Sequence, residues 1–168
     1  MKCLQLHLRV LCAMILAAIP GASSLPNPGA GSTQGLRAIE LQVHQDVNRE
    51  REAERLAGLT WNEPLAAEAR RHARNMVSRG FFAHEDPVRG DIESRLDRSH
   101  IEWIRCAENL YEQRGGSHPA KQAVKEWLHS PTHRRNMLDP TLRETGVGVA
   151  MRRDGTIVIV QEFLLRGV

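Results

Sequence analysis

Three short polar segments carry the side chains of this chain that are best suited to chemistry. They are Phe82–Pro87 (FAHEDP), Ala107–Leu110 (AENL) and His129–Asn136 (HSPTHRRN). Each combines histidine, carboxylate or amide groups, the types that act as acids and bases or bind zinc. Each also lies at or beside a predicted break in regular structure, where functional groups usually sit. The sequence has no HExxH, Gly-x-Ser-x-Gly, phosphate-binding glycine loop or CxxC pair, so the enzyme classes that those motifs mark are not indicated.

Helices are predicted to separate and support these polar segments. Apolar residues recur at helical spacing over Leu36–Ala57, which predicts a first helix. Asn62 is placed to cap a second helix, and Gly80 is placed to end it. A third helix is predicted to begin at Pro119 and to end at Ser130-Pro131, because the residue before a proline avoids helical dihedral angles.

The last part of the chain predicts a short helix followed by strands. The helix is expected at Thr132–Leu138, and Thr145–Met151 alternates in the manner of a strand. Asp154-Gly155 predicts a hairpin turn, and the apolar run Ile157–Val160 predicts a strand that is covered on both faces. The fold class is therefore α/β, with helices on both sides of a small, mostly antiparallel sheet.

The N-terminal part of the chain is typical of an exported protein. Basic residues precede the apolar run Val10–Ile19, and Ala22–Ser24 offers small residues for cleavage. The run is shorter than the ~20 residues that a membrane-spanning helix needs. We therefore predict a signal peptide at residues 1–24, a flexible linker at residues 25–35 and one domain at residues 36–168.

Composition narrows the class of protein further. The chain has 168 residues, of which 41% are hydrophobic and 26% charged, as in a single globular domain. Removing Lys2 and Arg9 with the signal peptide leaves 21 basic against 20 acidic residues, so the net charge falls from +3 to +1. We therefore expect no nucleic-acid partner, no transmembrane segment in the mature chain, and a secreted or periplasmic monomer.

Cys3 and Cys12 lie in the predicted signal peptide, so Cys106 alone remains and no internal disulfide is expected.

Taken together, the polar segments and their surroundings resemble the CAP superfamily (cysteine-rich secretory protein, antigen 5, pathogenesis-related 1), in its compact bacterial SCP-like branch. The matching segments, in order, are Leu59–Asn62 (LTWN), FAHEDP, AENL, Ala123–Leu128 (AVKEWL) running into HSPTHRRNML, Thr145–Val149 (TGVGV) and Gln161–Phe163 (QEF). The resemblance covers roughly residues 40–165. It implies a three-layer α/β/α sandwich, in agreement with the layers expected from the sequence pattern.

The resemblance also implies a central cleft that contains two histidines and acidic residues. Matched residue by residue, it places His84, Glu108 and His133 in this ligand-binding cleft. Two imidazoles and a carboxylate are similar to a zinc site with an open fourth position, so the same three residues are candidate ligands of a divalent metal. The second acidic residue of the family has no counterpart near His129-Ser130. Fewer negative ligands would weaken metal binding.

Two functions fit these residues, and whether the protein is an enzyme stays open at this point. The first is a binding module for a small ligand, a lipid or a cell-envelope component, which is favoured because no nucleophile is recognisable. The alternative is a protease-like extracellular hydrolase that uses metal-bound or histidine-activated water. Structural roles also compete: His84 could tie down a loop, Glu108 could clamp its strand, and His133 could cap carbonyls. His72 lies on an apolar helix stripe and is expected to be a hydrogen-bonded core residue.

Overall fold

The computed structural model of the chain describes residues 31–167. Its elements, in order, are α1 (Thr33–Ala53), β1 (Thr60–Trp61), α2 (Glu63–Arg79), α3 (Ile92–Arg98), β2 (Arg105–Arg114), α4 (Pro119–His129), α5 (Pro131–Met137), β3 (Glu144–Met151) and β4 (Thr156–Leu165). The predicted signal peptide at residues 1–24 lies outside the described residues. Residues 25–30 of the predicted linker also lie outside them, whereas residues 33–35 form the start of α1, so the linker prediction is wrong at its C-terminal end.

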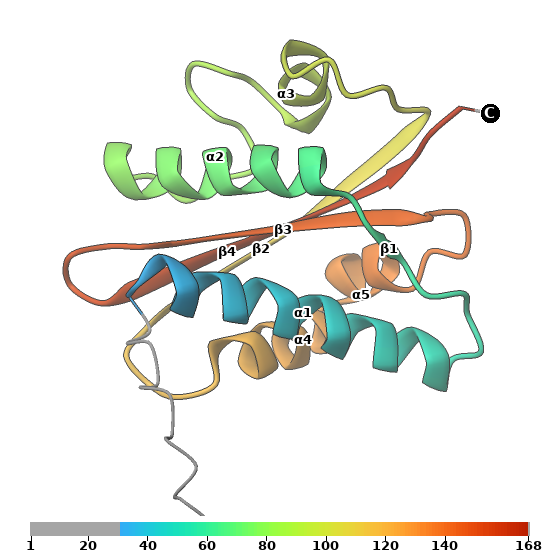
Figure 1. Cartoon of the computed structure of the whole chain (residues 1–168), viewed down its shortest axis with the longest axis horizontal. Coiled ribbons are helices and arrows are strands. Elements are labelled where there is room, and N and C mark those ends of the chain that lie inside the picture. Colours follow the sequence, from blue (N-terminus) through green and yellow to red (C-terminus); the bar gives the residue numbers. More distant parts are fainter. Residues whose placement is uncertain (1–30, 168) are drawn as a thin grey trace, which may run out of the picture.

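A four-stranded sheet forms the middle layer of the fold, in the order β1-β3-β4-β2. β4 pairs antiparallel with both β2 and β3, whereas β1 pairs with β3 in parallel. Helices α2 and α3 cover one face of the sheet, and α1, α4 and α5 cover the other (Figure 1). The prediction of a three-layer α/β/α sandwich with a mostly antiparallel sheet is therefore confirmed.

Helix α2 begins and ends where its sequence predicts. The Asn62 side chain accepts a hydrogen bond of 2.9 Å from the backbone N–H of Leu65. Gly80 ends the helix in the left-handed conformation, at φ 73°, and its N–H donates to the Met76 carbonyl. Helices α4 and α5 also lie within a residue of their predicted bounds.

Helix α1 ends at Ala53, four residues before the predicted end at Ala57. Arg55 adopts a left-handed conformation, at φ 60°, which interrupts the helix. The fully buried Arg51 holds the departing chain, because its Nε donates to the Ala57 carbonyl at 2.8 Å. The other nitrogens of this guanidinium donate to carbonyls at Met137, Asp139 and Leu142. One buried arginine thus joins the end of α1 to the segment that follows α5.

The two faces of β3 explain its alternation of glycine and valine. Val147 and Val149 pack into the core formed with α1 and α4. Gly146 and Gly148 face α2, whose backbone lies so close that a Cβ on Gly148 would be 2.0 Å from the backbone nitrogen of Arg70. The glycines therefore allow α2 to lie directly on the sheet. The hairpin after β3 runs over residues 152–155, longer than the two-residue turn that the sequence predicts.

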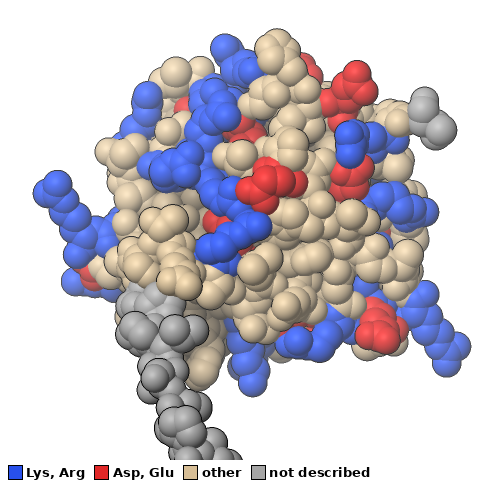
Figure 2. All heavy atoms as spheres, viewed as in Figure 1, with Lys and Arg blue, Asp and Glu red and all other residues tan. Residues whose placement is uncertain are grey.

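The free edge of β3 is covered by ion pairs. Beyond the end of β1, the buried Glu40 of α1 accepts a hydrogen bond of 3.3 Å from the Val149 N–H. Arg37 and Arg70 pair with both Glu40 and Glu63. The hydrogen bond from Arg70 is the largest of the effects that lower the pKa of Glu63 to about 2. Figure 2 shows basic side chains gathered across this face with acidic ones among them. Charged side chains over a sheet edge oppose pairing with another chain.

Candidate functional site

His84 and Glu108 are in direct contact. His84 lies in the loop between α2 and α3, and Glu108 lies in β2 on the face that these helices cover. Nδ1 of His84 is 2.8 Å from Oε1 of Glu108. The His84 side chain is 59% exposed, whereas that of Glu108 is only 3% exposed. An exposed imidazole is therefore held on a buried carboxylate.

Arg95 of α3 holds this pair from inside the protein. Its guanidinium is fully buried, contacts Oε2 of Glu108 and lies 3.3 Å from Oε1 of Glu162. The NH1 group of Arg95 also donates to the backbone carbonyl of His84 at 2.7 Å and to that of Gly90 at 3.3 Å. One side chain thus fixes both the carboxylate of Glu108 and the loop that carries His84.

Glu162 of β4 lies directly opposite Glu108 across the two strands. Like charges in opposite positions destabilise a sheet. Burial, and secondly the charge of Glu108, raise the pKa of Glu162 well above its ordinary value. We therefore expect Glu162 to be the protonated member of the pair, so that Arg95 neutralises the single charge of Glu108.

Glu162→Gln is expected to gain stability over wild type as the pH rises. A carboxyl whose pKa is raised on folding stabilises the protein at low pH and loses that stabilisation as the pH rises above the unfolded value, 4.5. Glutamine cannot ionise, so the difference in unfolding free energy should grow by at most about 1.4 kcal/mol per pH unit. Urea unfolding at about pH 5 and about pH 7.5 measures it. A difference that is the same at both pH values would contradict the assignment.

His72 supports the loop from α2. It is fully buried, and its Nε2 donates to the Ala83 carbonyl at 3.0 Å. Desolvation lowers the pKa of His72, which keeps the ring neutral. The structure thus confirms the hydrogen-bonded core role that the apolar stripe of this helix predicts.

His133 of α5 lies near His84 and Glu108, and hydrogen bonds fix α5 to β2. Asn109 donates to the His133 carbonyl at 3.1 Å, and Asn136 donates to the Glu108 carbonyl at 3.1 Å. Burial, and secondly the nearby His84, lower the pKa of His133. Among the hydrogen bonds of residues 31–167, none joins the His133 ring to His84 or Glu108. The structure therefore joins two of the three predicted site residues and places the third near them.

The predicted zinc ligands do not form a metal-binding group in this arrangement. Within the described part of the chain, no three His, Cys, Asp or Glu side chains are grouped so that they could hold a metal ion. Both oxygens of Glu108 already have partners, His84 and Arg95, and the arginine would repel a bound cation. These donors therefore do not fit a zinc ion as they stand.

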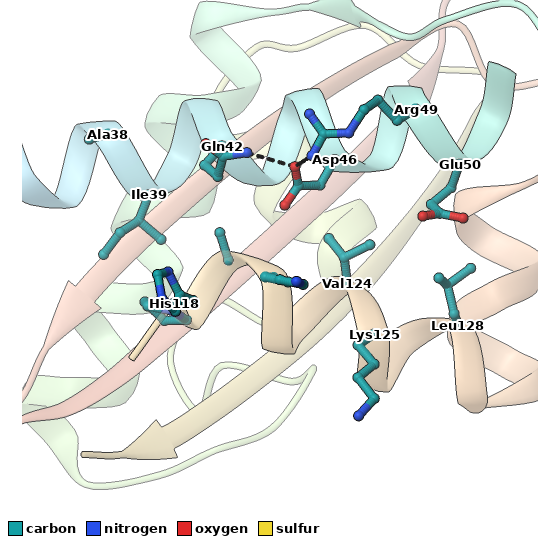
Figure 3. Close-up of a pocket in the computed structure, with 13 residues that line it drawn as sticks. Ala38, Ile39, Gln42, Asp46, Arg49, Glu50, His118, Val124, Lys125 and Leu128 are labelled. Atoms are coloured by element: carbon teal, nitrogen blue, oxygen red, sulfur yellow. Dashed lines mark hydrogen bonds and ion pairs between the residues drawn. The ribbon is translucent and has the colours of Figure 1, made fainter. Parts of the chain in front are cut away.

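Five hollows of about 600–710 Å³ lie elsewhere on the surface, and His84, Glu108 and His133 line none of these five. One hollow, of about 670 Å³, lies between α1 and α4 (Figure 3). Ile39, Val124 and Leu128 form part of its apolar wall. No helix within residues 31–167 is both long and apolar enough to cross a bilayer.

Sequence reasoning missed Arg95 and Glu162. Arg95 lies in the short segment Ile92–Arg98, where nothing in the local pattern distinguishes the buried Arg95 from the exposed Arg98. Glu162 does carry an indication, because a Gln-Glu pair interrupts an otherwise apolar strand. A polar pair in such a strand predicts buried hydrogen bonding, although not the partner.

The fold is thus a three-layer sandwich in which a glutamate of an edge strand lies beneath a loop histidine. The model of the cysteine-rich secretory protein (CAP) family matches residues 44–163. The chain therefore belongs to the CAP family, and its bacterial relatives place it in the SCP-like branch.

Three relatives illustrate this similarity. The uncharacterized protein YkwD of Bacillus subtilis is 27% identical over 129 residues, which cover 77% of this chain and 49% of that protein. The uncharacterized membrane protein YlbC of the same organism is 33% identical over 111 residues, covering 66% and 31%. The crystal structure of an extracellular SCP-domain protein from Bacillus anthracis is 26% identical with a TM-score of 0.72, covering 86% and 45%. The chain thus spans half or less of the length of these relatives.

Proposed function

We propose that the chain is a secreted CAP-domain protein that binds a small ligand, a lipid or a cell-envelope component at His84, Glu108 and His133. The observation that carries this proposal is the exposed imidazole of His84, held at 2.8 Å on the buried carboxylate of Glu108. An imidazole that is already oriented loses little rotational freedom when a ligand binds. The extracellular SCP-domain relative supports a site of action outside the cytoplasm.

The binding function is tested by following the rings of His84 and His133 by NMR in the full chain. The probes are soluble cell-wall fragments and micelles of a short-chain phospholipid, added separately. We expect one probe to shift both rings in a saturable manner and His84→Ala to weaken that binding at least tenfold (about 1.4 kcal/mol). The exposed His118→Ala, which lies outside the three polar segments, is the matched control and should bind as wild type does. Equal binding by wild type and His84→Ala would contradict the proposal.

A hydrolase is the alternative function, and one observation favours it. A carboxylate bonded to Nδ1 of His84 is the arrangement that orients a histidine base towards water or substrate. Cys106 does not offer a ready nucleophile, because burial, as the largest of several effects, raises the pKa of its thiol to about 12. Turnover of peptides or cell-wall fragments that both His84→Ala and His133→Ala abolish, while they remain folded, would establish the hydrolase. No turnover by wild type would remove it.

A further inference from the structure

The loop between α2 and α3 is held in one conformation by its own hydrogen bonds. The buried carboxylate of Asp86 accepts from the backbone N–H groups of Val88 at 2.9 Å and Arg89 at 3.0 Å. It also accepts from the side chain of Asn75 at 2.7 Å. The backbones of Asp86 and Gly90 exchange two further bonds of 2.9 and 2.8 Å. The loop is therefore ordered before any ligand binds.

Two arginines tie this loop to the helices beneath it. Arg95 donates to the carbonyl groups of His84 and Gly90. The NH2 group of Arg89 lies 3.1 and 3.2 Å from the two carboxylate oxygens of the buried Glu68. A ligand that docks on the loop therefore loses little free energy in ordering it, because the backbone from which the exposed side chains project is already fixed.

Two apolar side chains are exposed on this ordered loop. Phe82 is 41% exposed and Val88 is 58% exposed, and His84 lies between them in the sequence. Among the described residues, the other large hydrophobic side chains with this degree of exposure are Leu41, Ile104 and Met151. Single exposed apolar residues are ordinary, but two on the loop that also carries His84 suit a ligand with an apolar face.

The contact with Glu108 decides which nitrogen of His84 is available to a ligand. Oε2 of Glu108 is bound to the Arg95 guanidinium, so the carboxylate acts as an acceptor on both oxygens. Nδ1 of His84 therefore carries the proton in its bond to Oε1. In the neutral imidazole Nε2 then has a free lone pair, and this exposed ring accepts hydrogen bonds at that atom.

We infer that the ligand of this site is a hydroxyl-bearing glycan of the cell envelope. This inference rests on the proposed binding function and selects among its ligands. A pyranose ring offers hydroxyl donors to Nε2 of His84 and apolar C–H faces to Phe82 and Val88. A phosphate or carboxylate head group offers acceptors, which cannot bond to a lone pair and which the buried charge of Glu108 repels. A hydrocarbon chain alone fits Phe82 and Val88 but leaves Nε2 of His84 without a donor.

The first test is the tautomer of His84 in the free protein. Nitrogen-15 NMR of the ring at about pH 8, where histidine is ordinarily neutral, distinguishes a protonated nitrogen from a bare one. We expect the proton on Nδ1 and the lone pair on Nε2. A proton on Nε2 would overturn the inference, because the site would then offer a donor instead of an acceptor.

The second test is binding of a defined sugar, the tetramer of N-acetylglucosamine, to the full chain. We expect it to shift the resonances of His84 and Phe82 in a saturable manner, and Phe82→Ala to weaken binding about tenfold. Ile104→Ala is the matched control, since Ile104 is 63% exposed but lies outside the loop. Dihexanoylphosphatidylcholine, whose head group has no hydroxyl donor, and a neutral tetrapeptide are titrated in parallel.

The outcomes separate this inference from the proposed function. Binding of the phospholipid or the peptide at His84, without binding of the sugar up to about 10 mM, would overturn the glycan and leave the binding function standing. No shift at His84 with any of the probes, cell-wall fragments included, would count against both. Sugar binding that Phe82→Ala and Ile104→Ala weaken equally would also overturn the inference.

Discussion

Replacing Arg95 with methionine will lower the unfolding free energy by about 3–5 kcal/mol, the usual cost of removing one partner of a buried ion pair. Arg95 is fully buried, and methionine fills much of its volume without its charge. Glu108 would then remain buried without a cation, opposite Glu162 in the next strand. The carbonyl groups of His84 and Gly90 would lose their donor as well.

Urea unfolding of Arg95→Met and Arg98→Met measures this effect on matched variants of one short helix. Arg98 is exposed on α3, so its replacement should change stability by less than about 0.5 kcal/mol. If Arg95→Met does not fold, the double variant Arg95→Met/Glu108→Gln is measured instead. It removes the unpaired charge of Glu108 and should recover part of the lost unfolding free energy. A cost below about 1 kcal/mol for Arg95→Met would show that Glu108 does not depend on this cation.

The ends of the long helices could be predicted from the sequence because local chemistry determines them. The side chain of Asn62 caps the start of α2. At the other end Gly80 adopts a left-handed backbone conformation, which residues other than glycine rarely adopt. The end of α1 could not be predicted in this way. Its helical pattern continues to Ala57, but Arg51 holds that segment through carbonyl groups that lie up to 91 residues away.

The candidate site could likewise be predicted only in part from the sequence. His84 and Glu108 were predicted from a resemblance to a family, and the structure places their side chains in contact. Arg95 contacts both the Glu108 carboxylate and the His84 carbonyl, yet it lies 11 residues from His84 and 13 from Glu108 along the chain. The sequence of α3 has no strong periodic pattern, and no local pattern gives the register of β2 with β4. Contacts between distant parts of the chain decide which charged side chain is buried, so short sequence motifs do not predict it.

Gly148→Ala tests the close approach of α2 to the sheet, and we expect a loss of about 3 kcal/mol or more in unfolding free energy. The new Cβ would lie 2.0 Å from the backbone nitrogen of Arg70 and 2.2 Å from the carbonyl carbon of Ala69. These are backbone atoms of α2, so no side-chain rotation relieves the overlap and the helix must move away from β3. That movement would open the core beneath Ala73 and Met76.

Gly58→Ala is the matched control for this substitution, because both variants add the same methyl group. A Cβ on Gly58 would have its nearest neighbours at 3.6 Å, in the side chain of Asn48, which is an ordinary contact. We expect it to change stability by less than about 0.5 kcal/mol. Thermal and urea unfolding compare the two, and equal stabilities would show that α2 does not depend on the glycine face of β3. Displacement of α2 should also disturb the bond from His72 to Ala83, so the His84 ring resonances report whether the packing of α2 positions the site.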